Sequence, residues 1–134
     1  MPPLKAIVAA ARERWDELYG RLNATQQLRV SRLTVREQLA LLLALQPSLK
    51  LLTETPTAEE ARNTACVFSE SRSQFREDLL MLPMLLHVAD NKPGTFVELG
   101  AFDGVDSSNS IMLERCFGWT GVEHPSSPPH SQRC

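Results

Sequence analysis

Between residues 98 and 104 the chain places two carboxylates and two glycines close together, in the order Glu98, Gly100, Asp103 and Gly104. Glycine has no Cβ, so the backbone at Gly100 and Gly104 can turn tightly and lie close to a ligand. The two acids favour a cationic ligand and repel a pyrophosphate, and the third glycine of the dinucleotide pattern G-x-G-x-x-G is missing. A sulfonium-containing cofactor therefore fits this segment better than a dinucleotide. An ordinary joint between a strand and a helix would use the same residues.

The segments on either side predict that these residues follow the end of a strand. A β-prone run at residues 95–99 precedes Gly100, and a helix through residues 111–116 comes after, with Ser107 or Ser108 as its cap. This order is typical of the opening of a nucleotide-binding α/β sheet. Turns at residues 91–94 and 118–121 and a second short strand near residues 120–122 complete the pattern.

Residues 95–122 resemble the start of FkbM-type methyltransferase domains, and they read TFVELGAFDGVDSSNSIMLERCFGWTGV. That family shows F-V-E-x-G-A-x-D-G, then S-N, then G-W-x-G. Upstream, Ser73-Gln74 followed by Glu77-Asp78 is similar to the S-Q-x-x-E-D element of the family. The resemblance therefore covers about residues 71–122, with three linked motifs in the family's order.

The resemblance implies a class I, Rossmann-like fold that uses S-adenosyl-L-methionine, usually to methylate a hydroxyl oxygen. Such a transfer depends mostly on the positioning of two reactants, and neither a catalytic base nor the acceptor is identified. The cofactor-binding residues that the resemblance implies are Glu98, Gly100, Ala101, Asp103, Gly104 and Asn109.

The sequence departs from the family after Val122. In the family, the strand after G-W-x-G continues through apolar residues to an acid that holds the ribose hydroxyls. Here the chain reads Glu123-His124-Pro125, so Glu123 comes too early to match that acid. We therefore expect a truncated or frame-altered domain that binds S-adenosylmethionine weakly or not at all and is inactive. The alternative is a non-catalytic helical fragment or an interaction module.

The composition of the chain argues against a nucleic-acid partner and against a membrane-spanning segment. The 134 residues include 14 basic and 16 acidic side chains, for a net charge of −2, which argues against a nucleic-acid-binding protein. No apolar run approaches the roughly 20 residues of a membrane-spanning helix. The N-terminal apolar stretch at residues 4–11 contains Lys5 and is not a convincing signal peptide.

The cysteines point to a reducing compartment. Cys66, Cys116 and Cys134 form no C-x-x-C pair, and their number is odd. This pattern argues against a disulfide framework and against a zinc site, so no metal is expected. We expect reduced thiols in a cytoplasmic protein. An organelle transit peptide is the alternative, although the acids at Glu13 and Asp16 argue against it.

Apolar residues recur every three or four positions through the first ninety residues, which predicts helices. Thr34–Glu37 and Thr57–Glu60 have the spacing of capping boxes, and Pro83 predicts a kink or a restart. The expected helices run from Pro2 to near Gly20, from near Thr25, from Thr34 to Pro47, from Thr57 to about Val67 and from Gln74 to Ala89.

These patterns predict a mainly α fold with a partial α/β unit, the opening strand, loop and helix of a class I methyltransferase sheet. Three regions are expected: a helical N-terminal extension at 1–70, a partial methyltransferase domain at 71–122 and a disordered tail at 123–134. So little sheet would leave strand residues such as Val97 and Val122 uncovered, which favours self-association through an apolar face.

Overall fold

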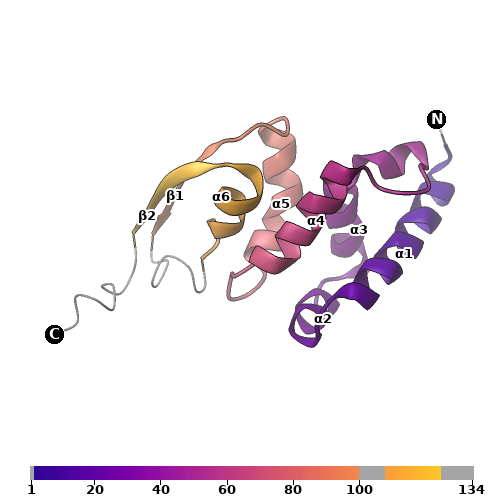
Figure 1. The fold of residues 1–134 in the computed structure, drawn as a ribbon, viewed down its shortest axis with the longest axis horizontal. Coiled ribbons are helices and arrows are strands. Elements are labelled where there is room, and N and C mark those ends of the chain that lie inside the picture. Colours follow the sequence, from indigo (N-terminus) through magenta and orange to yellow (C-terminus); the bar gives the residue numbers. More distant parts are fainter. Residues whose placement is uncertain (1, 100–107, 125–134) are drawn as a thin grey trace. The chain divides into compact units, whose positions relative to one another are not determined.

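The computed structural model describes residues 2–99 and 108–124, which form helices and a small parallel sheet (Figure 1). The chain divides into two compact units, residues 1–69 and residues 70–134. The expectation of a mainly helical chain with a partial α/β unit is confirmed. In chain order the elements are α1 (Leu4–Arg21), α2 (Ala24–Ser31), α3 (Val35–Leu45), the 3₁₀ helix η1 (Pro47–Leu51), α4 (Ala58–Glu70), α5 (Glu77–Val88), β1 (Thr95–Leu99), α6 (Ile111–Phe117) and β2 (Thr120–His124).

Side-chain caps begin α2, α3 and α4. Thr57 and Glu60 form the predicted capping box of α4, since each side chain accepts a hydrogen bond from the backbone N–H of the other. Thr34 caps α3 by accepting from the N–H of Glu37. A further capping box at Asn23 begins α2 and was not predicted. The prediction that the first helix ends near Gly20 is confirmed, although α1 continues to Arg21, so that Gly20 lies inside the helix and not after it.

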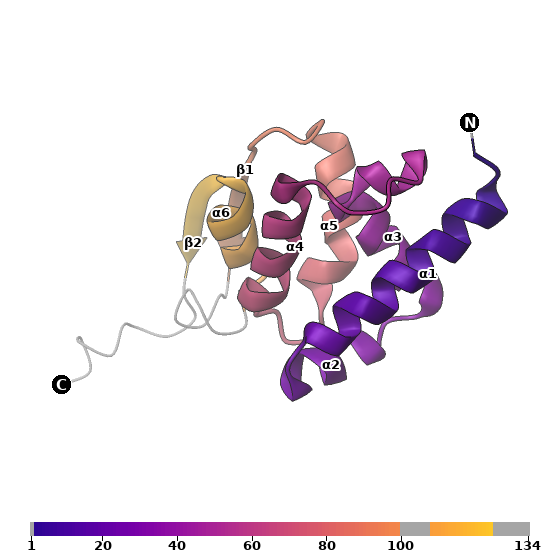
Figure 2. The ribbon, with the colours of Figure 1, turned by 45° about the vertical axis from the view of Figure 1, so that its right-hand side comes forward.

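The N-terminal unit has an aliphatic core with one aromatic pair. In Figure 2, α1 lies in front of α3, against which it packs. The ring of Trp15 on α1 meets the ring of Phe68 on α4 edge to face, with 6.4 Å between ring centroids. Leu41, Leu42 and Leu45 of α3 are buried, which accounts for the apolar run of that helix.

Helix α5 runs through Pro83 without a break, so the predicted restart at that residue is wrong. A proline inside a helix removes one backbone hydrogen bond and crowds the preceding turn. The apolar side chains of Leu79, Leu82 and Leu86 are buried along the same helix. Their burial offsets the cost of the proline, because each contributes about 1.5–3 kcal/mol.

The two strands of the C-terminal unit are parallel and adjacent, in a register that runs from Thr95 opposite Thr120 to Leu99 opposite His124. Both predicted strands are thus confirmed, and α6 lies between them in sequence. Gly121 lies opposite Phe96, and a Cβ there would come within 2.7 Å of the Phe96 ring and 2.1 Å of its carbonyl oxygen. The second glycine of the G-W-T-G sequence is therefore required for the strands to pair.

Cys66 and Cys116 are each disulfide-bonded, which differs from the expectation of reduced thiols. None of the helices described is long and apolar enough to cross a membrane.

The tail was predicted to begin at residue 123, but Glu123 and His124 belong to β2. The rest of the predicted tail lies outside the described residues.

Candidate functional site

The candidate site lies where β1 ends and α6 begins. Glu98, the fourth residue of the five-residue strand β1, has a buried side chain with 9% exposure. Its Oε1 accepts a hydrogen bond from the backbone N–H of Asn109 at 2.5 Å. Its Oε2 accepts from the hydroxyl of Ser108 at 2.8 Å and from the hydroxyl of Ser110. One carboxylate therefore joins the end of the strand to the three residues that precede the helix.

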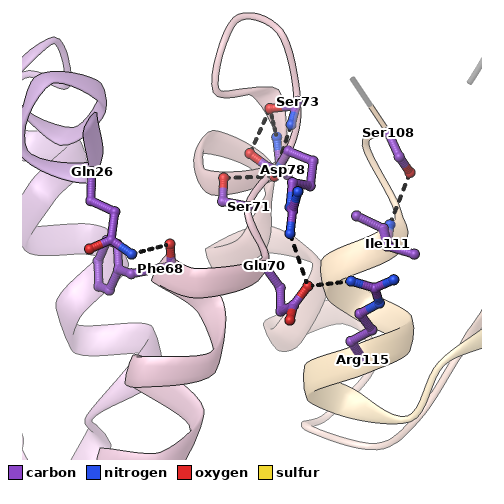
Figure 3. Close-up of polar contacts among 10 residues, drawn as sticks. Gln26, Phe68, Glu70, Ser71, Ser73, Asp78, Ser108, Ile111 and Arg115 are labelled. Atoms are coloured by element: carbon purple, nitrogen blue, oxygen red, sulfur yellow. Dashed lines mark hydrogen bonds and ion pairs between the residues drawn. The ribbon is translucent and has the colours of Figure 1, made fainter. Parts of the chain in front are cut away.

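Ser108 has a second role at the same place, as the side-chain cap of α6. Its hydroxyl oxygen accepts from the N–H groups of Ser110 at 3.2 Å and of Ile111 at 3.1 Å, the second of which is drawn in Figure 3. The predicted contact of Ser108 with the start of the helix is thus present, although the N-cap residue of α6 is Ser110. Because Ser108 also donates to Glu98, strand, cap and helix belong to one hydrogen-bonded network.

The structure brings two of the predicted site residues together. Glu98 and Asn109 are in contact through the Asn109 N–H, while the Asn109 residue itself is exposed. The backbone of Glu123 pairs with that of Glu98, so two acidic positions share the carboxyl end of the parallel strands. The remaining predicted cofactor residues, Gly100, Ala101, Asp103 and Gly104, lie outside the described residues.

A second buried carboxylate organises the bend before α5. Asp78 is 2% exposed, and its carboxylate accepts hydrogen bonds from the hydroxyls of Ser71 and Ser73 and from the backbone N–H groups of Arg72 and Ser73 (Figure 3). Ser73 and Asp78 are the first and last residues of the S-Q-x-x-E-D element. The hydrogen bonds between Ser73 and Asp78 explain the five-residue spacing between the serine and the aspartate of this element.

Glu77, beside Asp78, is held in its charged form. Burial acts to raise the pKa of the Glu77 carboxyl, but hydrogen bonds from its own N–H, from the N–H of Phe75 and from Ser73, together with the charge of Arg76, bring it below the usual range. The carboxylate accepts from the Phe75 N–H at 2.8 Å. Negative charge in the first turn also suits the N-terminus of α5.

Some contacts near the candidate site were not predicted from the sequence. Glu70, the last residue of α4, accepts a hydrogen bond from the guanidinium of Arg115 on α6 at 2.7 Å (Figure 3). Residues 70 and 115 lie 45 positions apart, so no local pattern could have paired them. Ser71 also donates a hydrogen bond to Asp78. The one sequence feature that could have pointed to it is its position two residues before the S-Q-x-x-E-D element.

The N-terminal unit holds an open cavity of about 480 Å³ that the sequence did not predict. Its lining includes Phe68 and the buried polar side chains of Gln46 and Thr64, which hydrogen-bond to each other at 3.3 Å. Arg14, also in the lining, donates to Gln46. These polar groups satisfy one another, so the cavity offers no unpaired buried group for a ligand.

Comparison of the sequence and structure with protein-family models, with curated proteins and with solved structures finds no match.

Proposed function

We propose that residues 70–124 are the opening β–α–β unit of an S-adenosylmethionine-dependent methyltransferase domain of the FkbM type, with a hydroxyl oxygen as methyl acceptor. The observation that carries the proposal is the parallel pairing of β1 and β2, with α6 as the connection between them. Parallel strands joined through a helix are the building unit of sheets that bind nucleotides outside their carboxyl ends. The Rossmann-like assignment rests on this unit and on the motifs of residues 71–122.

The charge at this edge suits the proposed cofactor. S-adenosylmethionine carries a sulfonium and an ammonium group against one carboxylate, and it supplies the methyl group that is transferred. Glu98 and Glu123 are opposite each other in register, one residue before the end of each strand. The described partners of the Glu98 carboxylate are neutral groups, so its negative charge is available to attract a cation through space. Gly100, Ala101, Asp103 and Gly104 would complete the site between Leu99 and Ser108.

The test is a titration of the full-length, isotope-labelled chain followed by NMR, which detects weak binding. We expect weak, saturable shifts with S-adenosylmethionine at the amides of Glu98, Leu99 and residues 108–111. Gly100→Val should abolish these shifts, because a side chain there blocks close approach of the ligand. ATP is the control, since its phosphates are repelled by the two acids. Absence of saturable shifts, or equal shifts with ATP, would overturn the proposal.

A second candidate function is self-association through the face of the sheet that α6 does not cover. Val97, Leu99 and Val122 are exposed by 76%, 78% and 67%. Parallel sheets are normally covered on both faces. By register this face also includes Thr95, Thr120 and His124, so it holds no acid, lysine or arginine among the described residues. Two copies of the chain can therefore meet without bringing like charges together, which makes a second copy the occupant that the face fits.

Sedimentation equilibrium of the full chain tests this second candidate. We expect a concentration-dependent dimer that Val97→Glu dissociates, because a buried unpaired carboxylate opposes association. The matched control is Val35→Glu, which places the same change at an exposed valine of α3. A chain that stays monomeric at all concentrations, or a dimer that both variants dissociate equally, would rule out this face.

A further inference from the structure

We propose that Glu98 is a positioning residue rather than a direct cofactor ligand: its carboxylate fixes the end of β1 to the start of α6. This inference rests on the proposed function, in which cofactor binds at that edge. The resemblance assigns Glu98 to the ligands of the cofactor, whereas its described contacts are all internal to the protein.

The hydrogen bonds of Glu98 leave little of its carboxylate for a ligand. An ionised carboxylate has about four acceptor sites. Three are taken, by the Ser108 hydroxyl, the Asn109 N–H and the Ser110 hydroxyl. With 9% of the residue exposed, a ligand would have to displace one of these donors to bind both oxygens. The charge of Glu98 therefore acts on a cation at a distance, while its oxygens hold protein groups.

The three donors are consecutive residues directly before α6, so their hydrogen bonds to Glu98 hold the start of the helix in place. Ser108 both donates to Glu98 and caps the helix through the N–H groups of Ser110 and Ile111. Glu98 consequently fixes the position at which α6 begins relative to β1. Residues 100–107 connect these two points, so the contact sets the separation of the ends of the predicted cofactor segment.

Amide hydrogen exchange on the full chain tests the contact without any ligand. In Glu98→Gln, an amide replaces one of the two acceptor oxygens, and its NH₂ group faces hydroxyls that already donate. We expect the exchange of the Asn109, Ser110 and Ile111 amides to accelerate at least tenfold. The Asn109 N–H loses its carboxylate acceptor, and the Ser108 hydroxyl, which accepts from the other two N–H groups, is no longer held by the Glu98 carboxylate. Glu114→Gln, at an exposed acid on α6, is the matched control and should leave these rates unchanged. Unchanged protection in Glu98→Gln would overturn the proposal.

A double-mutant cycle on cofactor affinity separates positioning from direct binding. Ser110→Ala removes a hydroxyl that donates to Glu98 and leaves the Ser108 cap intact. If Glu98 acts by positioning, each single variant weakens S-adenosylmethionine binding, and the double variant is no weaker than Glu98→Gln alone. If Ser110→Ala has no effect and Glu98→Gln alone abolishes binding, Glu98 is a direct ligand and the inference is wrong. Should the wild-type chain not bind the cofactor, the proposed function fails, and the exchange experiment still decides whether Glu98 holds α6.

Discussion

Ser73 and Asp78 form two hydrogen bonds with each other across the bend before α5. Ser73 Oγ donates to Asp78 Oδ1 at 2.6 Å and accepts from the Asp78 backbone N–H at 3.2 Å. Both residues are buried. The spacing of five residues in the S-Q-x-x-E-D element thus places the serine hydroxyl within reach of both the carboxylate and the N–H of Asp78, in the first turn of α5.

We expect Asp78→Asn to destabilise the protein by about 1.5–3 kcal/mol, since hydrogen bonds to a charged, buried acceptor are among the stronger ones. The amide keeps the shape of the side chain, but its NH₂ group faces donors where the carboxylate accepted. Urea unfolding of the full chain followed by circular dichroism measures the change. Gln74→Ala, at an exposed position of the same bend, is the control and should stay within about 0.5 kcal/mol of the wild type. An unchanged midpoint for Asp78→Asn would contradict the buried network.

Two glycines should respond in opposite directions to replacement by alanine. In Gly121→Ala, the new Cβ would come within 2.1 Å of the Phe96 carbonyl oxygen, so the strands must shift, at a cost of about 1–3 kcal/mol. In Gly20→Ala, nothing lies within 4 Å and the residue is helical, so a gain of about 0.5–1 kcal/mol is expected. Thermal unfolding of both variants tests the pair. Equal effects of the two substitutions would show that the close approach of Phe96 and Gly121 is wrong.

Two leucines of η1 provide a matched test of the N-terminal core. Leu49 is fully buried, with 0% exposure, and Leu51 is 75% exposed. Leu49→Ala should cost about 2–5 kcal/mol through lost burial and the cavity it leaves. Leu51→Ala should change the free energy of unfolding by no more than about 0.5 kcal/mol. Chemical denaturation distinguishes them, and similar losses for both would mean that η1 packs by its other face.

Stability should depend on the ionisation of Glu60. Burial acts to raise the pKa of its carboxyl, but hydrogen bonds from the Ser48 hydroxyl, the Ser48 N–H and the Thr57 N–H and the charge of Arg14 hold it below the ordinary range. A carboxyl whose pKa is lower in the folded chain stabilises the fold above its unfolded pKa of about 4.3. That contribution is lost as the pH falls through the folded pKa.

Melting temperatures at pH 6 and pH 3 therefore test Glu60. We expect Glu60→Gln to lower the melting temperature at pH 6 and to lie closer to the wild type at pH 3, where the wild-type carboxyl is itself losing its charge. The adjacent Glu59→Gln, at an exposed position of the same helix turn, should show no such pH dependence. A constant difference between Glu60→Gln and the wild type over this range would exclude a role for the charge.

Local signals were enough to locate the elements. The capping box at Thr57 and Glu60 and the contact of Ser108 with the start of α6 join residues close in sequence, and the strand at residues 95–99 was predicted from a short β-prone run. The start of α2 was predicted near Thr25, one residue late, because Asn23 was not considered as a cap. At Pro83 the sequence predicted a kink or a restart, and the restart does not occur because burial along α5 outweighs the effect of a single proline.

The amino-acid pattern was enough to predict the order of helices and strands and to identify Glu98 and Asn109 as candidate site residues. The contacts of these residues follow from the fold, because the hydrogen bonds between residue 98 and residues 108–110 form only when strand and helix lie side by side. The contact of Glu70 with Arg115 was likewise beyond any local pattern. Such contacts join positions far apart in sequence, and their geometry depends on how whole elements pack.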